Sequence, residues 1–536
     1  MAASRQPLMP GWLVPGSAVA LLLCGVALLA FGALFSAAPL ADWRSLLSDS
    51  YLHHVLLFSF EQALLSALLS VLPAIPLARA LYRRRFPGRT LLLRLCAMTL
   101  VLPVLVAVFG LLSVYGRNGW LAQLCHVIGM DYHFSPYGLQ GILLAHLFFN
   151  LPLATRMLLQ ALESIPGEQR QLAAQLGVRG WNAFRLLEWP WLRRQLLPTA
   201  ALIFMLCFAS FATVLALGGG PRATTLELAI YQALSFDYDP ARAALLALLQ
   251  LGCCLLMVLL SQRFSQTIPT GSQTLRGWRD PQDSAWARIG DGMCLALALL
   301  LLLPPLAAVI VDGLRGGIAG ALRQAALWQA TFTSIRIAVG ASLLCVTLTV
   351  MLLWSSRELR QRQRDAMAQT LELSGMLILA MPGIVLASGF FLLFNATIGL
   401  PQRADALVIF TNALIAIPYA MKVLENPMRD LTARYSVLCA SLGIHGLNRL
   451  RWIELRALRR PLAQALAFAC VLSIGDFGVV ALFGSADFRT LPFYLFQQLG
   501  AYRGADGAVT ALLLLLLCLL LFTLMEKRAG HHAHSE

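Results

Sequence analysis

Long apolar runs separated by short polar and basic segments dominate the chain. A transmembrane α-helix takes about 20 mostly apolar residues, and twelve stretches reach that length. None shows the ten-residue alternation typical of transmembrane β-strands. The sequence therefore predicts twelve transmembrane helices, at about 12–36, 55–82, 91–115, 137–160, 196–218, 241–262, 290–312, 328–354, 370–395, 404–424, 462–484 and 507–525.

The composition excludes a soluble protein. Of 536 residues, 59% are hydrophobic and 12% are charged, whereas soluble domains are about 45–50% apolar and about 25% charged. The predicted fold class is an all-α polytopic membrane protein. The first apolar run is too long for a cleaved signal peptide and lacks its small-residue exit. The eleven cysteines form no CxxC pair, so we expect no disulfide framework, no metal site and no cofactor.

The positive charges are unevenly placed. If both termini are cytoplasmic, 31 of the 41 Lys and Arg residues lie at inner segments and ten at outer ends. This bias follows the positive-inside rule and predicts that both termini are cytoplasmic. It also accounts for the net charge of +15, so nucleic-acid binding is not expected.

The chain contains an internal repeat. A shift of 266 residues overlays 152–218 on 418–484 without a gap, with roughly twenty identical positions. An offset of 279 pairs two further positions upstream, Pro103 with Pro382 and Gly110 with Gly389. The identical polar and glycine positions include Gly177/Gly443, Gly180/Gly446, Asn182/Asn448, Arg185/Arg451 and Glu188/Glu454.

Six spans separate equivalent points, so the two copies have the same orientation. The sequence predicts two parallel six-helix repeats related by an axis along the membrane normal, unlike the inverted repeats of many carriers. The expected organisation is a first helix and outer loop, a first repeat, an inner linker with helix seven and an outer loop, a second repeat, and a polar cytoplasmic tail. These segments are 1–54, 55–262, 263–327, 328–526 and 527–536.

The inner loop after the fourth span carries the most information. Pro166 and Gly167 precede a short predicted helix over 169–176, Gly177 supplies a helix stop, and an amphipathic turn follows over 181–189. Such helices often lie solvated or at a membrane interface. Two equivalent copies, each too apolar to remain bare in the cytoplasm, favour docking to a protein partner.

These loops resemble the E-A-A-x-x-x-G motif of ABC-importer permeases. Gly177 and Gly443 match its glycine, and Ala173, Ala174 and Ala440 match its small residues. Both copies depart from the motif at the acidic position, which holds Gln171 in the first copy and Val437 in the second. The residues that the resemblance assigns to coupling with an ATPase are Gln171, Ala173, Ala174, Gly177, Gly180, Val437, Ala440, Gly443 and Gly446.

Over essentially its whole length, the chain is similar to the thiamine permeases of Gram-negative bacteria. The resemblance implies type I importer architecture, an inner-membrane location and transport of thiamine or its phosphate esters. It also implies two copies of a cytoplasmic ABC ATPase and a periplasmic thiamine-binding protein as partners. The permease itself would not be an enzyme, and the sequence agrees, since it contains no phosphate-binding G-x-x-x-x-G-K-[ST] motif.

Ionisable residues inside spans are functional candidates. Asp476 lies in the eleventh span, and its equivalent in the first repeat is Ser210. It either satisfies neighbouring backbone or a serine, or faces a pathway for a cationic solute. Glu61 and Arg336 occupy equivalent positions near the outer ends of two spans when Ser59 is aligned with Ser334. They either reach the interface separately or pair as an outer gate.

Three other functions remain as alternatives. The first is the permease of a related iron(III) or polyamine ABC importer. The second is a self-sufficient secondary carrier with two parallel halves, which would have no reason to keep the paired loops. The third is a membrane enzyme, for which the sequence offers no site.

Overall fold

The computed structural model describes residues 10–38, 48–99, 101–178, 180–264, 285–397, 404–444, 446–484 and 488–530. Regular structure in these ranges is helical, with no strand, which confirms the predicted all-α class. The expected inner linker falls largely on residues 265–284, and the end of the polar tail on 531–536; both lie outside the described residues.

Contacts divide the chain into two compact units, which are described separately. The first-repeat unit comprises Ser45–Ala229 and Gly252–Gly316. The second-repeat unit comprises Met1–Arg44, Ile230–Leu251 and Gly317–Glu536. Both units therefore take in chain from outside their own repeat. The division by residue ranges made from the sequence stays a prediction.

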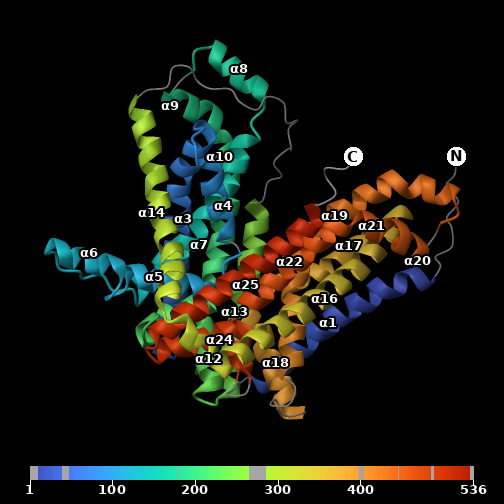
Figure 1. Cartoon of the computed structure of the whole chain (residues 1–536). Coiled ribbons are helices and arrows are strands. Elements are labelled where there is room, and N and C mark those ends of the chain that lie inside the picture. Colours follow the sequence, from blue (N-terminus) through green and yellow to red (C-terminus); the bar gives the residue numbers. More distant parts are fainter. Residues whose placement is uncertain are drawn as a thin grey trace. The chain divides into compact units, whose positions relative to one another are not determined.

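In the first-repeat unit, α3, α7 and α10 pack against one another, and α14 packs against α3 and α5 (Figure 1). Helices α12 and α13 pass from one unit to the other along the chain. The elements are α3 (Ser50–Arg83), α4 (Arg89–Met98), α5 (Val104–Tyr115), α6 (Trp120–Ile128), α7 (Leu139–Glu163), α8 (Gly167–Gln175), α9 (Gly180–Ala183), η1 (Phe184–Glu188), α10 (Trp189–Phe208), α11 (Phe211–Leu217), η2 (Pro221–Ala223), α12 (Leu226–Ser235), α13 (Pro240–Phe264) and α14 (Ala285–Arg315).

In the second-repeat unit, α16, α19 and α22 form the equivalent mutual packing, and α1 packs against α16 and α18. Figure 1 shows α1 beside α16 along much of its length. The elements are α1 (Pro10–Ala37), α15 (Ile318–Leu322), α16 (Ala325–Gln361), α17 (Asp365–Met376), η3 (Leu377–Ala380), α18 (Gly383–Thr397), α19 (Ala404–Ser441), α20 (Gly446–Arg449), η4 (Leu450–Glu454), α21 (Leu455–Ala457), α22 (Arg459–Gly475), α23 (Gly478–Phe483), α24 (Leu491–Gly500) and α25 (Gly504–Gly530).

Equivalent hydrogen bonds recur in the two units. The Ser59 hydroxyl on α3 accepts a hydrogen bond from the Leu226 amide at 3.0 Å. The Ser334 hydroxyl on α16 accepts one from the Leu491 amide at 2.7 Å. The alignment of Ser59 with Ser334 therefore holds in three dimensions, with α3 equivalent to α16 and α12 equivalent to α24.

The helix that precedes each repeat packs on the other repeat. The shift that aligns Ser59 with Ser334 also aligns α1 with α14, yet α1 belongs to the second-repeat unit and α14 to the first-repeat unit. Equivalent glycines admit both helices. A Cβ at Gly110 of α5 would lie 2.4 Å from the Pro305 carbonyl oxygen, and one at Gly389 of α18 would lie 2.9 Å from the Ala30 carbonyl oxygen.

Nine helices of the described chain are long and apolar enough to cross a membrane, or up to eleven if each of two bent pairs is one span. Twelve were expected. The predicted span at 91–115 is divided between α4 and α5, and that at 370–395 between α17, η3 and α18. Both divisions occur at the equivalent prolines, Pro103 and Pro382, because proline lacks the amide needed to continue a helix.

The tight glycine contacts predict a matched loss of stability. Gly110→Ala or Gly389→Ala would force the backbone of the covering helix outward, with a cost of about 1–3 kcal/mol in the free energy of unfolding. Thermal unfolding of the detergent-purified chain measures it. Gly252→Ala is the control, since a Cβ there meets nothing within 4 Å. Equal midpoints for all three variants would contradict the close approach.

Candidate functional site

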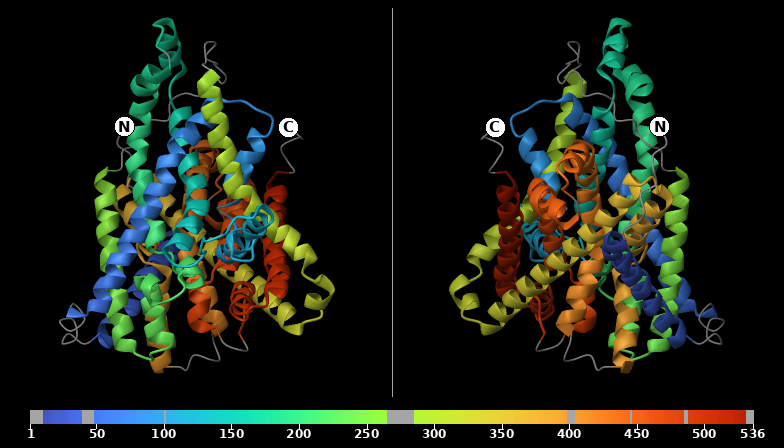
Figure 2. Two further views of the ribbon diagram at one scale, coloured as in Figure 1. Left: turned by 90° about the vertical axis from the view of Figure 1, so that its left-hand side faces the viewer. Right: turned by 90° about the vertical axis from the view of Figure 1, so that its right-hand side faces the viewer.

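The first inner loop follows α7 and contains the helix and turn predicted from the sequence. Pro166 precedes α8, and no residue of α8 is buried. Gly177 takes φ +67°, and the Val178 amide donates to the Ala173 carbonyl at 2.9 Å, which closes the helix end. Figure 1 shows α8 and α9 at one end of α3, α7 and α10, and in both views of Figure 2 the α8 segment extends beyond them.

The second inner loop repeats this helix end. Gly443 takes φ +65°, and the Ile444 amide donates to the Cys439 carbonyl at 2.9 Å. Both residues stand 266 positions after their counterparts. A five-residue π-helix, called a π-turn below, follows in each copy: η1 in the first and η4 in the second. The two are again 266 residues apart.

The two loops differ in one respect. In the first copy, α7 ends at Glu163 and α8 is a separate helix, whereas α19 continues unbroken through the equivalent residues to Ser441. The shift of 266 places Thr432 and Ala433 where the first copy has Pro166 and Gly167. The second copy therefore lacks the proline that interrupts the helix.

Both loops expose apolar side chains at the same positions. Leu172 and Leu438 are 57% and 51% exposed, and Leu176 and Leu442 are 70% and 63% exposed. Two further equivalent apolar side chains, Leu186 and Trp452, are also exposed. Each surface is therefore apolar and lacks a partner within its described unit, which is typical of a docking surface.

The predicted coupling residues lie on these surfaces. Gln171 and Val437, at the position of the missing acid, are both exposed. Ala173 and Ala174 are half-buried on α8, and Gly180 begins α9 with φ +55°. Ala440 lies in α19 and Gly446 begins α20, but their side-chain positions lie outside the described part of the structure.

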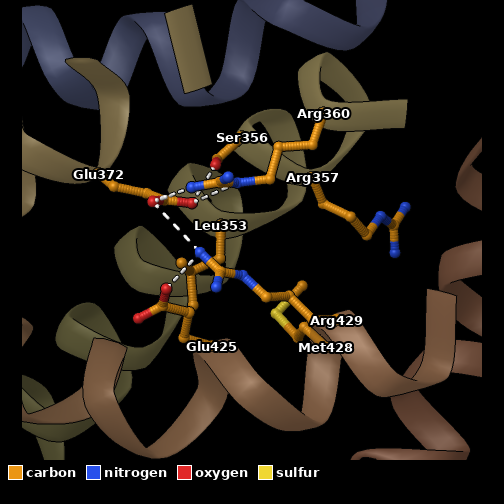
Figure 3. Close-up of a pocket in the computed structure, with 8 residues that line it drawn as sticks. All are labelled: Leu353, Ser356, Arg357, Arg360, Glu372, Glu425, Met428 and Arg429. Atoms are coloured by element: carbon orange, nitrogen blue, oxygen red, sulfur yellow. Dashed lines mark hydrogen bonds and ion pairs between the residues drawn. The ribbon is translucent and has the colours of Figure 1, made fainter. Parts of the chain in front are cut away.

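An ion-pair cluster joins α16, α17 and α19 in the second-repeat unit (Figure 3). Glu372 on α17 accepts hydrogen bonds from Ser356 and Arg360 on α16, at 2.6 and 2.7 Å, and lies 3.5 Å from Arg429 on α19. Arg357 lines the same small pocket, but in Figure 3 it points away from this cluster.

Equivalent spans are broken at Ser210 and Asp476. Helix α10 ends at Phe208 and α11 begins at Phe211, with a bend of 55° between them. In the second repeat, α22 ends at Gly475 and α23 begins at Gly478. Ser210 and Asp476 stand at these two breaks, as the sequence alignment predicts. A break inside a membrane frees backbone groups that need partners, and the Ser210 hydroxyl donates to the Cys207 carbonyl at 2.7 Å.

Asp476 supports the end of α23. Its carboxyl accepts hydrogen bonds from the amides of Gly478, Val479 and Val480 and from the Asn412 side chain, while Oδ2 has no partner among the described residues. These contacts favour the backbone-satisfying interpretation. The side chain is only half-buried by solvent accessibility, so a role toward a solute stays a prediction as well.

A second buried carboxyl, that of Glu227 on α12, serves the equivalent break in the first repeat. The side chain is buried, and the Phe211 amide at the start of α11 hydrogen-bonds to it. Burial raises the pKa of Glu227 to about 8. Sequence reasoning missed this residue because it lies between two predicted spans. Its one signal was an acid within the mostly apolar run 226–234.

The proposed outer-gate residues have different surroundings. Arg336 forms an ion pair with Asp405 on α19, a partner that the sequence analysis did not consider. Glu61 is an exposed residue of α3. Because the two residues belong to different units, their pairing stays a prediction.

Comparison with known proteins shows which family the chain belongs to. Residues 68–268 match the family model described as binding-protein-dependent transport system inner membrane component. The thiamine transport system permease proteins of Escherichia coli K12 and Salmonella typhimurium are 72% and 70% identical over all 536 residues, which is the full length of each. The Haemophilus influenzae protein of that name is 44% identical over 498 residues, 93% of this chain and 92% of its own.

The chain belongs to the thiamine transport system permease family.

Membership in this permease family confirms that the chain is a membrane-spanning transport component of ABC importers and not an enzyme. The described residues contain no cluster of three or more His, Cys, Asp or Glu side chains that could hold a metal ion.

Glu227 predicts a pH dependence of stability. Its carboxyl is neutral in the folded protein at pH 7 and ionised in the unfolded chain, so the folded state binds more protons. The free energy of unfolding should fall as pH rises from about 4.5 to about 8. Glu227→Gln keeps a neutral acceptor and should remove part of this fall, as measured by thermal unfolding in detergent.

The control is Asp237→Asn, which neutralises an exposed carboxylate in the segment that follows α12. Its stability profile should follow that of the unmodified chain. If Glu227→Gln and the unmodified chain have parallel profiles across this range, the carboxyl is not held neutral by burial.

Proposed function

We propose that this permease translocates thiamine or its phosphate esters, working with two copies of a cytoplasmic ABC ATPase and a periplasmic thiamine-binding protein. Relatives up to 72% identical over the full chain bear the name thiamine transport system permease. The family description, a binding-protein-dependent inner membrane component, supports a delivery protein and a location in the inner membrane.

The pair of inner loops is the observation that carries the proposal. Each has the same glycine-terminated helix end and exposes apolar side chains at the same three positions. One chain with two equivalent docking surfaces fits two identical ATPase subunits. A secondary carrier would gain nothing from exposing them to water.

The proposed topology places both loops and both termini in the cytoplasm. The excess of Lys and Arg at these segments supports it. The ATPases would then bind where their nucleotide is available, and the opposite ends of the spans would face the binding protein.

The solute pathway in this proposal includes the two helix breaks. Ser210 and Asp476 lie at equivalent helix breaks, and Oδ2 of Asp476 has no partner among the described residues, which suits a positively charged thiazolium ring. Glu61 and Arg336 stay the proposed outer-gate residues.

The loops should be the ATPase contacts. Leu176→Ser or Leu442→Ser removes an exposed apolar anchor and should weaken ATPase association by about tenfold or more, since a buried leucine contributes about 1.5–3 kcal/mol. The measurement is titration of purified ATPase onto the permease in lipid nanodiscs, followed by ATP-dependent thiamine uptake in vesicles that also receive the binding protein.

Val127→Ser is the matched control, since Val127 is 83% exposed on α6, outside both loops. It should leave ATPase association unchanged. Full uptake of thiamine by vesicles that lack the ATPase would contradict the proposal and favour a carrier. Full ATPase binding by both leucine variants would place the docking surface elsewhere.

Asp476 should contribute a modest preference for a cation, on the order of 1 kcal/mol, because a tight site would trap the solute after delivery. Asp476→Asn should slow uptake about fivefold and leave solute-independent ATP hydrolysis nearly intact. Asp476→Glu should be milder if charge matters. If Asp476→Glu is the worse variant, the short side chain serves α23 alone.

A further inference from the structure

A partly buried ion pair joins the first loop to α3. Arg79 Nε on α3 lies 2.5 Å from Glu188 Oε2, at the end of η1, and the side chains are 21% and 9% exposed. The same guanidinium lies 4.7 Å from the centroid of the Phe184 ring and within 3.4 Å of the Gly180 carbonyl oxygen. One arginine of α3 therefore contacts the segment that links α8 to α10 at three residues.

The second loop has the same kind of attachment. Arg357 Nη1 on α16 lies 2.5 Å from Glu454 Oε1 at the end of η4, with side chains 7% and 3% exposed. Arg449 on α20 adds a second contact to that oxygen at 2.8 Å. Glu454 is therefore held from the membrane helix and from within the loop. This explains why Arg357 points away from the cluster around Glu372 in Figure 3.

The glutamates are equivalent in sequence, but their arginine partners are not. The shift of 266 pairs Glu188 with Glu454, whereas the shift that relates α3 to α16 places Trp354 opposite Arg79. Arg357 comes three residues later, about one turn along α16 and on the same face. The arginine therefore comes from a different helical position in each repeat. The ion pair to the equivalent glutamate is nevertheless present in both.

Stability alone does not explain these pairs. Desolvation offsets most of the attraction in a buried ion pair, and apolar packing of similar volume is often as stable. A charge pair does fix position, because either charge left alone is costly. Each glutamate also ends a π-turn, a feature frequent at functional sites, and α10 begins directly after the first of them.

We propose that Arg79–Glu188 and Arg357–Glu454 transmit movement of the docked loops to the membrane helices α3 and α16. The four residues are positioning residues for translocation: they contact neither solute nor nucleotide, and they keep each loop from moving independently of its helix. This inference rests on the proposed function, since it assumes that an ATPase drives the loops.

Two neighbouring ion pairs of the same residue types supply matched controls. Arg89 and Glu163 lie 3.5 Å apart beside the first loop, and the Glu163 side chain is 55% exposed. Glu358, on α16 next to Arg357, pairs with Arg362, the residue that follows the helix. Neither pair reaches a π-turn, so Glu163→Gln and Glu358→Gln test charge loss without loss of the attachment.

The first arm of the test needs no partner protein. Hydrogen exchange on the full chain in nanodiscs should show amides of 180–190 exchanging about tenfold faster in Glu188→Gln. Those of 446–457 should respond in the same way in Glu454→Gln. The control variants should match the unmodified chain. Unchanged exchange in both glutamine variants would overturn the proposal, because the pairs would not hold the loops.

The second arm uses the complete importer. Glu188→Gln and Glu454→Gln should bind the ATPase as the unmodified chain does, while solute-stimulated ATP hydrolysis and uptake fall about tenfold. The double variant Arg79→Glu with Glu188→Arg should regain part of both. Wild-type coupling in the glutamine variants would overturn the proposal even if hydrogen exchange accelerates.

Two further outcomes are decisive. In the first, hydrogen exchange accelerates in the glutamine variants, but neither these variants nor the unmodified chain binds the ATPase. This result would show that the ion pairs hold the loops, but it would refute the proposed function. The transmission proposal, which depends on that function, would be refuted as well. In the second, the glutamine and charge-exchanged variants fail to insert into the membrane while both control variants insert. The ion pairs would then be needed for folding, which also overturns the proposal.

Discussion

Every backbone amide and carbonyl inside a bilayer needs a partner supplied by the protein itself. Continuous helices meet this condition unaided, and most of the described chain is built from them. At the two helix breaks the condition is met by side chains: Asp476 receives amides of α23, and Glu227 receives the first amide of α11. A carboxyl therefore supplies part of the missing hydrogen bonding at each of these two breaks.

Glycine contacts and ion pairs hold the helices against one another. With little hydrophobic drive between helices in lipid, close backbone approach stabilises association, and Gly110 and Gly389 provide it for α14 and α1. Near the ends of several helices, charged pairs make the contacts instead. The Glu372 cluster joins α16, α17 and α19, and the two buried glutamates fix the loops.

Much of this could be predicted from the sequence. Apolar run length gives most of the spans, and the shift of 266 predicts the equivalence of Gly177 and Gly443, since glycine at a helix end has a specific conformational reason to recur.

Other features could not be predicted. The breaks at Pro103 and Pro382 were not predicted as breaks, although the two prolines are equivalent in the sequence. Glu227 was missed because span prediction treats everything between two spans as loop. The partners of Glu188 and Glu454 could not be found from the repeat, because Arg79 and Arg357 are not equivalent positions. Tertiary contacts alone reveal them.

The exchange of α1 and α14 bears on how the chain can be made. As the chain is synthesised, α1 enters the membrane long before α16 and α18 exist, and the first repeat is complete in sequence before α14 follows it. Neither unit can close around its own half alone, so final packing waits for distant parts of the chain. Fusion of the two halves guarantees that both covering helices are present in equal number. It also means that a chain severed at the inner linker would leave each fragment carrying the helix that its counterpart needs.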